Sequence, residues 1–187
     1  IRSNAWSAGG LVGVWAEENT REAIFDALAK REVYATSGPR IGLRFGLNED
    51  DAELCTADGW MPRATMGEVT QITSKPMFTV QVQADITPIT SIEIIKLTYK
   101  DNRAHEEVIL LWHKPEGAAL ACIQWTDEQF DSASATLWYP RVKERATPRW
   151  SAVQCAAAGR CDEFPEMDAT LQERAWGSPI WHIPATD

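Results

Sequence analysis

The pattern of hydrophobic and polar positions changes its period at Ile41. Before this residue, apolar side chains recur at the spacing of an amphipathic helix, at Ala23, Ile24, Ala27 and Leu28. Asn19 or Thr20 is a suitable N-cap, and with Asn19 as the cap Glu22 completes a pair like a capping box. VYAT at 33–36 has strand composition and ends at an SGP turn. Residues 9–41 therefore predict a loop, one helix and one strand, which is the pattern of an α/β layer.

From Ile41 onward the period is two, which is typical of half-buried strands. The segments with this period are IGLRF (41–45), MFTVQVQA (77–84), IEIIKLTY (92–99), EEVILLW (106–112), ACIQW (121–125) and TLWYPRVKE (136–144). Turn-rich or polar linkers separate most of them, and no helical pattern lies between them. This succession favours an antiparallel β-sandwich. Residues 48–72 are long and irregular, and we expect them to form a loop over one end of the sandwich.

After Trp150 the periodicity weakens, and Pro165, Pro179 and Pro184 interrupt the chain. We expect an extended tail that lies on the body and is held by its tryptophans. The predicted fold class is therefore mainly β. It is an antiparallel β-sandwich over 41–150, preceded by one helix–strand unit over 1–40 and followed by an extended tail over 151–187.

Composition and charge remove several classes of protein. The chain has 187 residues, of which 44% are hydrophobic, and no apolar run approaches the length needed to cross a bilayer. The formal net charge is −9, and no basic cluster is present to neutralise successive phosphates. We therefore expect a globular protein without a membrane span and without a nucleic-acid partner.

The cysteines suggest a compartment. Cys155 and Cys161 lie in CAAAGRC, which is too widely spaced for a CxxC metal or redox motif. The spacing favours a local disulfide and hence an oxidising compartment, whereas the alternative is two free buried thiols in a cytosolic protein. The sequence leaves the pairing of Cys55 and Cys122 open.

Few residues suggest chemistry directly. The three histidines do not form an HxH, HExxH or DxH motif, so the sequence predicts no metal ligand in this chain. Glu17, Glu18 and Asn19 precede the helix N-terminus, where sites often form in α/β enzymes, although capping and the helix dipole explain them equally well. Among nine tryptophans, Trp60 lies in the irregular loop and is a candidate platform for a sugar ring.

Several segments together resemble a known family. GGLVGVWAEENTREAIFDALAKREVYATSGPRI (9–41) is similar to the last helix and strand of the metallohydrolase fold of the polymerase-and-histidinol-phosphatase (PHP) type, in the branch called domain of unknown function 3604 (DUF3604). Matches follow in the same order: ATMGE (64–68), SIEIIK (91–96), WTDEQFDSASATLWYPRV (125–142), ATPRW (146–150) and LQERAWGSPIW (171–181). The chain departs from the family pattern at Leu97 and Thr98, where a Gly-Trp pair is usual.

The resemblance implies that this chain corresponds to the C-terminal, β-rich part of a longer metal-dependent hydrolase of ester, phosphoester or similar bonds. Its divalent metal (Zn, Mn or Mg) would lie in a missing N-terminal domain, so the chain alone would be inactive. Glu17, Glu18, Asn19 and Arg40 would lie near the seam between the two parts. Family members are often exported, which implies a periplasmic or secreted protein.

Two other functions stay open at this point. The tryptophans and the sandwich favour a non-catalytic binding module for a glycan or a protein. An isolated helix with an apolar face favours a structural appendage that forms homo-oligomers.

Overall fold

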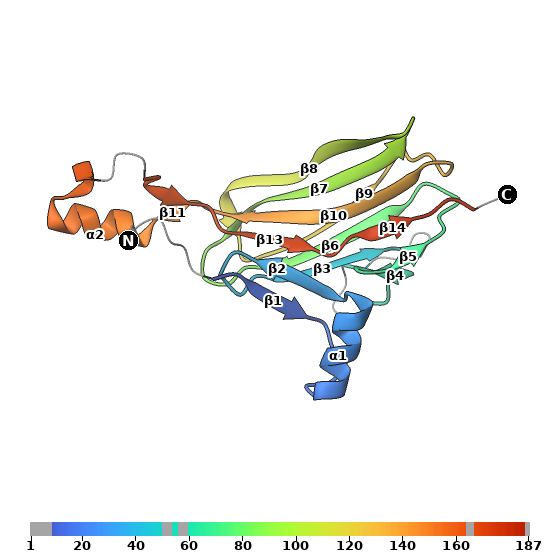
Figure 1. Cartoon of the computed structure of the whole chain (residues 1–187), viewed down its shortest axis with the longest axis horizontal. Helices are drawn as coiled ribbons and strands as arrows, with labels where there is room; N and C mark the ends of the chain where they lie inside the picture. The colour runs from blue at the N-terminus through green and yellow to red at the C-terminus, as the bar shows by residue number, and fades with distance from the viewer. Residues whose placement is uncertain (1–8, 50–53, 56–59, 164–166, 186–187) are drawn as a thin grey trace.

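The structure is a computed structural model that describes residues 9–49, 54–55, 60–163 and 167–185. It is mainly β and consists of two large sheets packed face to face (Figure 1). The first half of the chain contributes β1 (Leu11–Val14), α1 (Arg21–Lys30), β2 (Val33–Thr36), β3 (Gly42–Leu47), β4 (Ala64–Thr65), β5 (Val69–Thr70), β6 (Met77–Gln83) and β7 (Ile89–Lys100). The second half contributes β8 (Arg103–Ala118), β9 (Leu120–Thr126), β10 (Ala135–Glu144), β11 (Thr147–Pro148), α2 (Trp150–Ala158), a 3₁₀ turn (Cys161–Glu163), β12 (Thr170–Leu171), β13 (Arg174–Gly177) and β14 (Ile180–His182).

Strand β10 is the centre of the eight-stranded sheet. On one side it pairs along its whole length with β7, which in turn pairs with β8. On the other side it pairs with β14 through residues 136–138 and with β13 through residues 141–143. β13 continues to β2 and β1, and β14 continues to β5 in a parallel pair. The second sheet has the order β4-β3-β6-β9 and is antiparallel throughout.

The predicted antiparallel sandwich is confirmed, and its six strands correspond to β3, β6, β7, β8, β9 and β10. The sequence pattern missed three features. The predicted loop before the helix contains β1, which pairs with β2. The predicted loop over 48–72 contains the short strands β4 and β5, which pair with β3 and β14. The predicted tail contains the helix α2 and the strands β13 and β14. These strands were missed because their pairing with β10 depends on contacts far apart in sequence rather than on a local period.

The core lies between the two sheets and is centred on aromatic side chains. Phe78 of β6 lies with its ring centroid 5.3 Å from that of Phe45 and 5.0 Å from that of Trp138, and all three side chains are fully buried. Aliphatic side chains from β3, β6 and β7 surround them. Because aromatic side chains bury large areas, this cluster provides much of the hydrophobic stabilisation of the sandwich.

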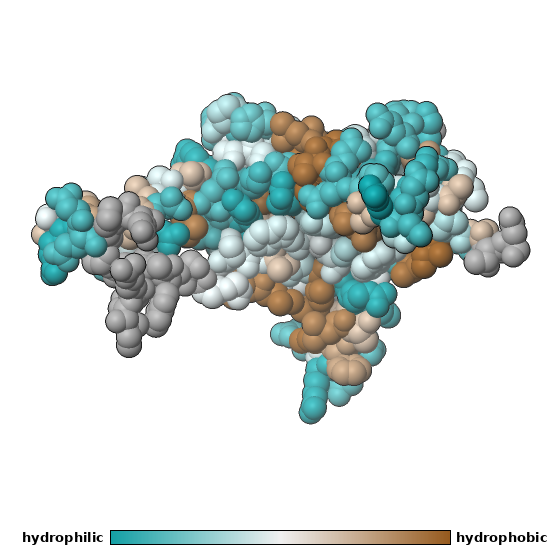
Figure 2. All heavy atoms as spheres, turned by 45° about the horizontal axis from the view of Figure 1, so that its top comes forward, coloured by the Kyte–Doolittle hydropathy of each residue, from teal (hydrophilic) through white to brown (hydrophobic). Residues whose placement is uncertain are grey.

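Helix α1 projects from the side of the body next to β1 (Figure 1). Its N-cap is Thr20, the second of the two candidates, whose hydroxyl accepts a hydrogen bond from the Ala23 amide. Arg31 ends it in the left-handed conformation (φ 63°) and donates from Nε to the Gly67 carbonyl. Within the helix only Ala27 is buried, so most of the apolar face has no partner in the described residues. Figure 2 shows apolar side chains gathered around its base.

A buried ion pair connects the two halves of the sandwich. The Asp127 carboxylate accepts a hydrogen bond from the Trp138 indole at 3.0 Å and pairs with the Lys96 ammonium at 2.6 Å. The side chains of Asp127 and Lys96 are 3% and 8% exposed. Removing the carboxylate would leave a buried ammonium and a buried indole N–H without a partner, which is a costly arrangement.

We therefore expect Asp127→Ala to destabilise the protein by about 3–5 kcal/mol, measured by urea unfolding. The neighbouring Glu128, which forms an exposed pair with Lys75, is the matched control. Because exposed pairs contribute little, Glu128→Ala should cost less than about 1 kcal/mol. Equal losses for the two variants would contradict the role given to the buried pair.

Neither α1 nor α2, the two α-helices of the described residues, is long and apolar enough to cross a membrane.

Candidate functional site

The outer face of the four-stranded sheet carries the candidate site. Leu43, Phe45 and Leu47 of β3 point into the core, so the residues that alternate with them face outward. The register places Arg44 of β3 opposite Gln81 of β6, and Gln81 opposite Cys122 of β9. Gly42, Gln83 and Leu120 form the next outward row. Because Gly42 has no side chain, this row leaves a hollow beside Arg44.

Two described parts of the chain after β3, residues 54–55 and 60–62, contact this outer face. A disulfide joins Cys55 to Cys122, and the Gln81 side-chain amide donates to the Leu54 carbonyl at 2.6 Å. Farther along the segment, a Cβ atom on Gly46 would lie 2.7 Å from Pro62 and 3.1 Å from the Trp60 ring. A glycine at position 46 is therefore what allows Trp60 to lie close over the strand.

Trp15 forms one wall of the hollow. Its backbone N–H donates to the Glu32 carbonyl at 3.0 Å, and its indole N–H donates to the Leu43 carbonyl at 2.8 Å. Its ring centroid lies 6.2 Å from that of Tyr34. Two hydrogen bonds on opposite sides of the residue fix the ring beside β3, although 36% of Trp15 stays exposed.

The Arg44 guanidinium lies against two indole rings. Its central carbon is 4.1 Å from the Trp15 ring centroid and 5.7 Å from the Trp60 ring centroid. Stacking of this kind is attractive because the ring faces carry negative charge density. Trp60, the platform predicted from the sequence, therefore lies beside a second tryptophan and an arginine.

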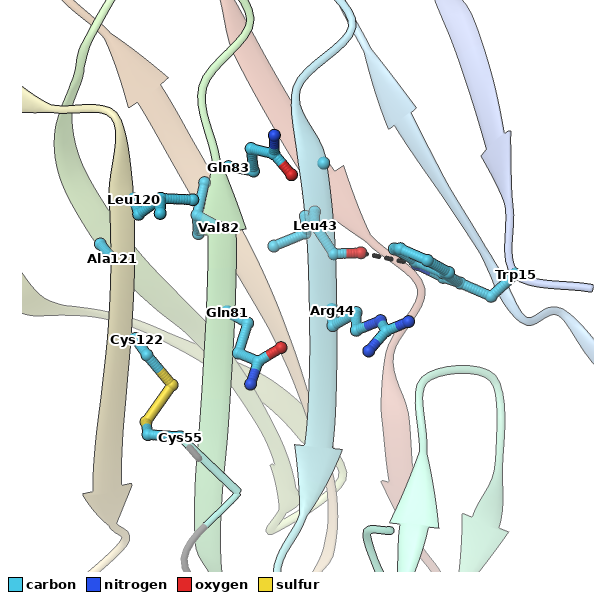
Figure 3. A pocket seen from close by; sticks show the side chains of 11 residues that line it. Trp15, Leu43, Arg44, Cys55, Gln81, Val82, Gln83, Leu120, Ala121 and Cys122 are labelled. Carbon is cyan, nitrogen blue, oxygen red and sulfur yellow. Dashed lines mark hydrogen bonds between the residues drawn. A yellow bond between two sulfur atoms is a disulfide. The ribbon is translucent and has the colours of Figure 1, made fainter. Parts of the chain in front are cut away.

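Two adjoining hollows meet at Trp15 and Arg44. The first, which we call the groove, has a volume of about 510 Å³ and is open to solvent (Figure 3). Arg44 and the amides of Gln81 and Gln83 lie between Trp15 and the Cys55–Cys122 bridge. The second, about 410 Å³, we call the acidic hollow because three carboxylates line it: Glu17, Glu32 and Glu68. Volumes of this size are typical of small-molecule sites.

The structure separates the residues that the sequence placed near a seam. Glu17, Glu18 and Asn19 are exposed in the turn before α1, and Glu17 lines the acidic hollow. Arg40 is exposed beyond the far end of β2, where its backbone N–H donates to the Asp85 carboxylate at 2.8 Å. Because β1 and β2 are antiparallel, Arg40 and Glu17 lie at opposite ends of that pair.

Sequence reasoning missed Trp15 and Arg44. The outward position of Arg44 in the period-two pattern of β3 was visible, but nothing in the sequence placed a tryptophan 29 positions earlier against it. Within the described residues, no three His, Cys, Asp or Glu side chains are grouped so that they could hold a metal ion. The indole, guanidinium and amide groups that line the groove are suited to binding through cation–π contacts and hydrogen bonds.

A second polar cluster lies at the end of β10. Glu144 is 2% exposed, and its Oε1 atom has no hydrogen-bond partner in the described part of the chain. Burial, together with the neighbouring charges of Glu173 and Asp85, raises the pKa of Glu144 to about 7. Ser37 donates a hydrogen bond to the Glu173 carboxylate. The cluster therefore favours a protonated Glu144 below neutral pH.

The fold is a β-sandwich with a solvent-open groove on its outer face. The chain belongs to the family described as "Protein of unknown function (DUF3604)", whose model matches residues 1–112 and 110–184. This confirms the family that the sequence segments resemble. No curated protein and no solved structure shows significant similarity to the chain.

Both disulfides are formed, and they differ in what they close. The predicted Cys155–Cys161 bridge is confirmed, spans 6 residues and begins within α2, whereas Cys55–Cys122 spans 67 residues and lines the groove. Under the chain-entropy account, replacing both cysteines by serine should cost about 4 kcal/mol for Cys55–Cys122 and about 2 kcal/mol for Cys155–Cys161. Urea unfolding under non-reducing conditions measures both values, and a larger loss for the short bridge would contradict this ranking.

The raised pKa of Glu144 predicts a pH dependence of stability. The folded-state pKa of about 7 exceeds the usual value of 4.5, so the folded state binds more protons between these values. The free energy of unfolding should therefore fall as pH rises from about 4.5 to about 7. Glu144→Gln should remove the fall in the free energy of unfolding that this carboxyl causes. At about pH 8 the variant should be more stable than the wild type by roughly 1–3 kcal/mol.

Urea unfolding at several pH values measures the effect of the Glu144 carboxyl. Glu106→Gln, at an exposed position of β8, is the control and should leave the pH profile unchanged. A Glu144→Gln profile that coincides with the wild-type profile would show that the carboxyl is not the source of the decline.

Proposed function

We propose that this chain is the β-rich, non-catalytic part of a metal-dependent hydrolase of ester, phosphoester or similar bonds. Support comes from its membership of the DUF3604 family and from the resemblance of residues 9–41 to the last helix and strand of a PHP-type metallohydrolase. In this proposal the divalent metal is held by an N-terminal domain of the longer protein. The two disulfides fit an oxidising compartment, so the proposal places the protein outside the cytoplasm.

The observation that carries this proposal is the apolar face around α1. Phe25 and Leu28 on the helix are 68% and 47% exposed, and Val12 on β1 is 63% exposed. β1 pairs only with β2 among the described residues, so its other edge presents backbone groups without strand partners. An apolar helix face beside an open strand edge matches the surface that a neighbouring α/β domain would cover.

The proposal also assigns a place to Glu17 and Glu18. Both lie in the turn between β1 and α1, at the border of the apolar face. A domain packed on that face would bring its own surface next to these carboxylates. In this arrangement Glu17 and Glu18 contribute to the seam between the two domains, while the metal ligands come from the N-terminal domain.

Substitution of Phe25 tests the docking step. In the chain extended N-terminally by the segment that its gene encodes upstream, Phe25→Glu should lower the free energy of unfolding by roughly 1.5–3 kcal/mol, because a buried phenylalanine would be replaced by a charge. The rate at which this variant hydrolyses aryl esters and phosphoesters with Mn²⁺ or Zn²⁺ should fall as well. In the 187-residue chain the same substitution should change stability by less than about 0.5 kcal/mol.

The matched control is Leu110→Glu on β8, at a residue that is 58% exposed and remote from α1. It should leave the extended protein unchanged in both stability and activity. Two results would contradict the proposal: an extended protein without metal-dependent turnover, or a Phe25→Glu variant that behaves like Leu110→Glu. Light scattering of the 187-residue chain adds one further outcome, because a dimer that Phe25→Glu dissolves would assign the face to self-association instead.

A second candidate function is supported by the groove itself. Trp15 and Arg44 line a hollow together with the amides of two glutamines, and Arg44 also lies over the ring of Trp60, which lines the adjoining acidic hollow. Aromatic rings beside amide side chains are the groups with which proteins hold sugars, through contact of the ring with C–H groups and hydrogen bonds to hydroxyls. We therefore also propose that the chain is a glycan-binding module, a role that is compatible with attachment to a hydrolase.

A further inference from the structure

The charge of the groove narrows the ligand class of this proposed binding module. Arg44 is the charged side chain among the residues that line it, and the rest are aromatic, amide, aliphatic or disulfide groups. No carboxylate of the described residues forms an ion pair with Arg44. In a chain of net charge −9, a cation that faces a hollow and has no carboxylate partner among the described residues indicates a ligand that supplies the negative charge.

The way Arg44 is held leaves its donors free. The guanidinium carbon lies over the rings of Trp15 and Trp60, and these cation–π contacts use none of its N–H donors. No hydrogen bond from these N–H groups to another described residue is present in the structure. The contacts therefore hold the guanidinium beside the groove while its donors stay available for a carboxylate, which it can bind through two parallel hydrogen bonds.

The neutral part of the groove suits hydroxyl groups. The Gln81 amide nitrogen is already bonded to the Leu54 carbonyl, so its oxygen remains as an acceptor, and Gln83 is exposed with both its oxygen and its nitrogen. Because Gly42 has no side chain, the surface between Gln83 and Arg44 is open; a Cβ atom at position 42 would lie 3.4 Å from the Cβ of Gln83. A sugar ring with its hydroxyl groups can lie over this surface, with the indole of Trp15 as a side wall (Figure 3).

The acidic hollow excludes highly charged ligands. Glu17, Glu32 and Glu68 line it, and it shares Trp15 and Arg44 with the groove. A polyanion with closely spaced sulfates or phosphates would extend into this negative field, and at such short range salt screens the repulsion only in part. The site therefore favours a ligand with one carboxylate at Arg44 and neutral groups around it.

We propose that the groove binds an acidic saccharide, with the carboxylate of a uronic acid residue on the Arg44 guanidinium and ring hydroxyls on Gln81 and Gln83. The inference rests on the proposed glycan-binding role and is independent of the hydrolase proposal.

Calorimetric titration of the 187-residue chain with glucuronoxylotriose, a xylotriose that carries a single glucuronic acid residue, with its methyl ester and with neutral xylotriose tests the ligand class. Glucuronoxylotriose should bind, with a change in tryptophan fluorescence, and the ester and the neutral sugar should bind roughly 10- to 100-fold more weakly because they lack the charge-assisted hydrogen bonds. Equal binding of all three would overturn the uronic acid assignment but keep the glycan-binding role. Binding of none would overturn both.

Two variants locate the site. Arg44→Gln should weaken glucuronoxylotriose binding roughly 10- to 100-fold and abolish the preference over the methyl ester. Arg103→Gln makes the same charge change at the exposed first residue of β8 and should leave binding unchanged. Gly42→Leu keeps Arg44 but fills the floor of the groove, at a position with ordinary strand geometry, and should also abolish binding.

Thermal unfolding of each variant checks that it is folded. If Arg44→Gln is unstable, Gly42→Leu still decides the outcome, because it leaves the stacked arginine in place. Glucuronoxylotriose binding that survives either variant with unchanged affinity would place the ligand elsewhere and overturn the proposal.

Discussion

Strand β3 contributes Leu43, Phe45 and Leu47 to the core between the sheets, so Gly42, Arg44 and Gly46 must face the other side. This alternation produces both the core and the groove from one six-residue strand. The two outward glycines leave room on either side of Arg44. Gly42 leaves room for the groove, and Gly46 allows Trp60 to approach the strand. A register shift of one residue would place the arginine in the core and the aromatic ring in solvent, and the hydrophobic side of the strand prevents such a shift.

Three further contacts hold the segment that follows β3 against this face. The disulfide to Cys122, the Gln81 bond to the Leu54 carbonyl and the fit of Pro62 over Gly46 lie at separate points along it. Trp15 is fixed from the opposite direction by hydrogen bonds of its backbone and its indole. Trp15 and Trp60 are therefore both held against the sheet before a ligand binds, which lowers the entropic cost of ordering these two side chains on binding.

The strands of the sandwich could be predicted from sequence because their signal is local: buried and exposed side chains alternate within each of them. β13 and β14 are short, and their place in the sheet is set by β10, which lies more than thirty positions earlier. The same limit applies to the site. Trp60 stood out by its irregular surroundings and Cys155–Cys161 by its spacing, whereas the Trp15–Arg44 stack and the Cys55–Cys122 bridge depend on which strands become neighbours.

The apolar face around α1 and the groove are joined through a single short segment. Trp15 directly follows β1, whose open edge lies beside that face, and its ring forms the wall of the groove. Glu17, two residues later, lines the acidic hollow. A domain packed on α1 and β1 would therefore border the acidic hollow and narrow it without covering Arg44. An acidic saccharide in the groove would then lie next to the neighbouring domain. Domain docking and saccharide binding are compatible because they use opposite sides of the turn that follows β1. Any coupling between docking and binding would have to pass through Trp15, since it belongs to the strand end on one side and to the ligand wall on the other.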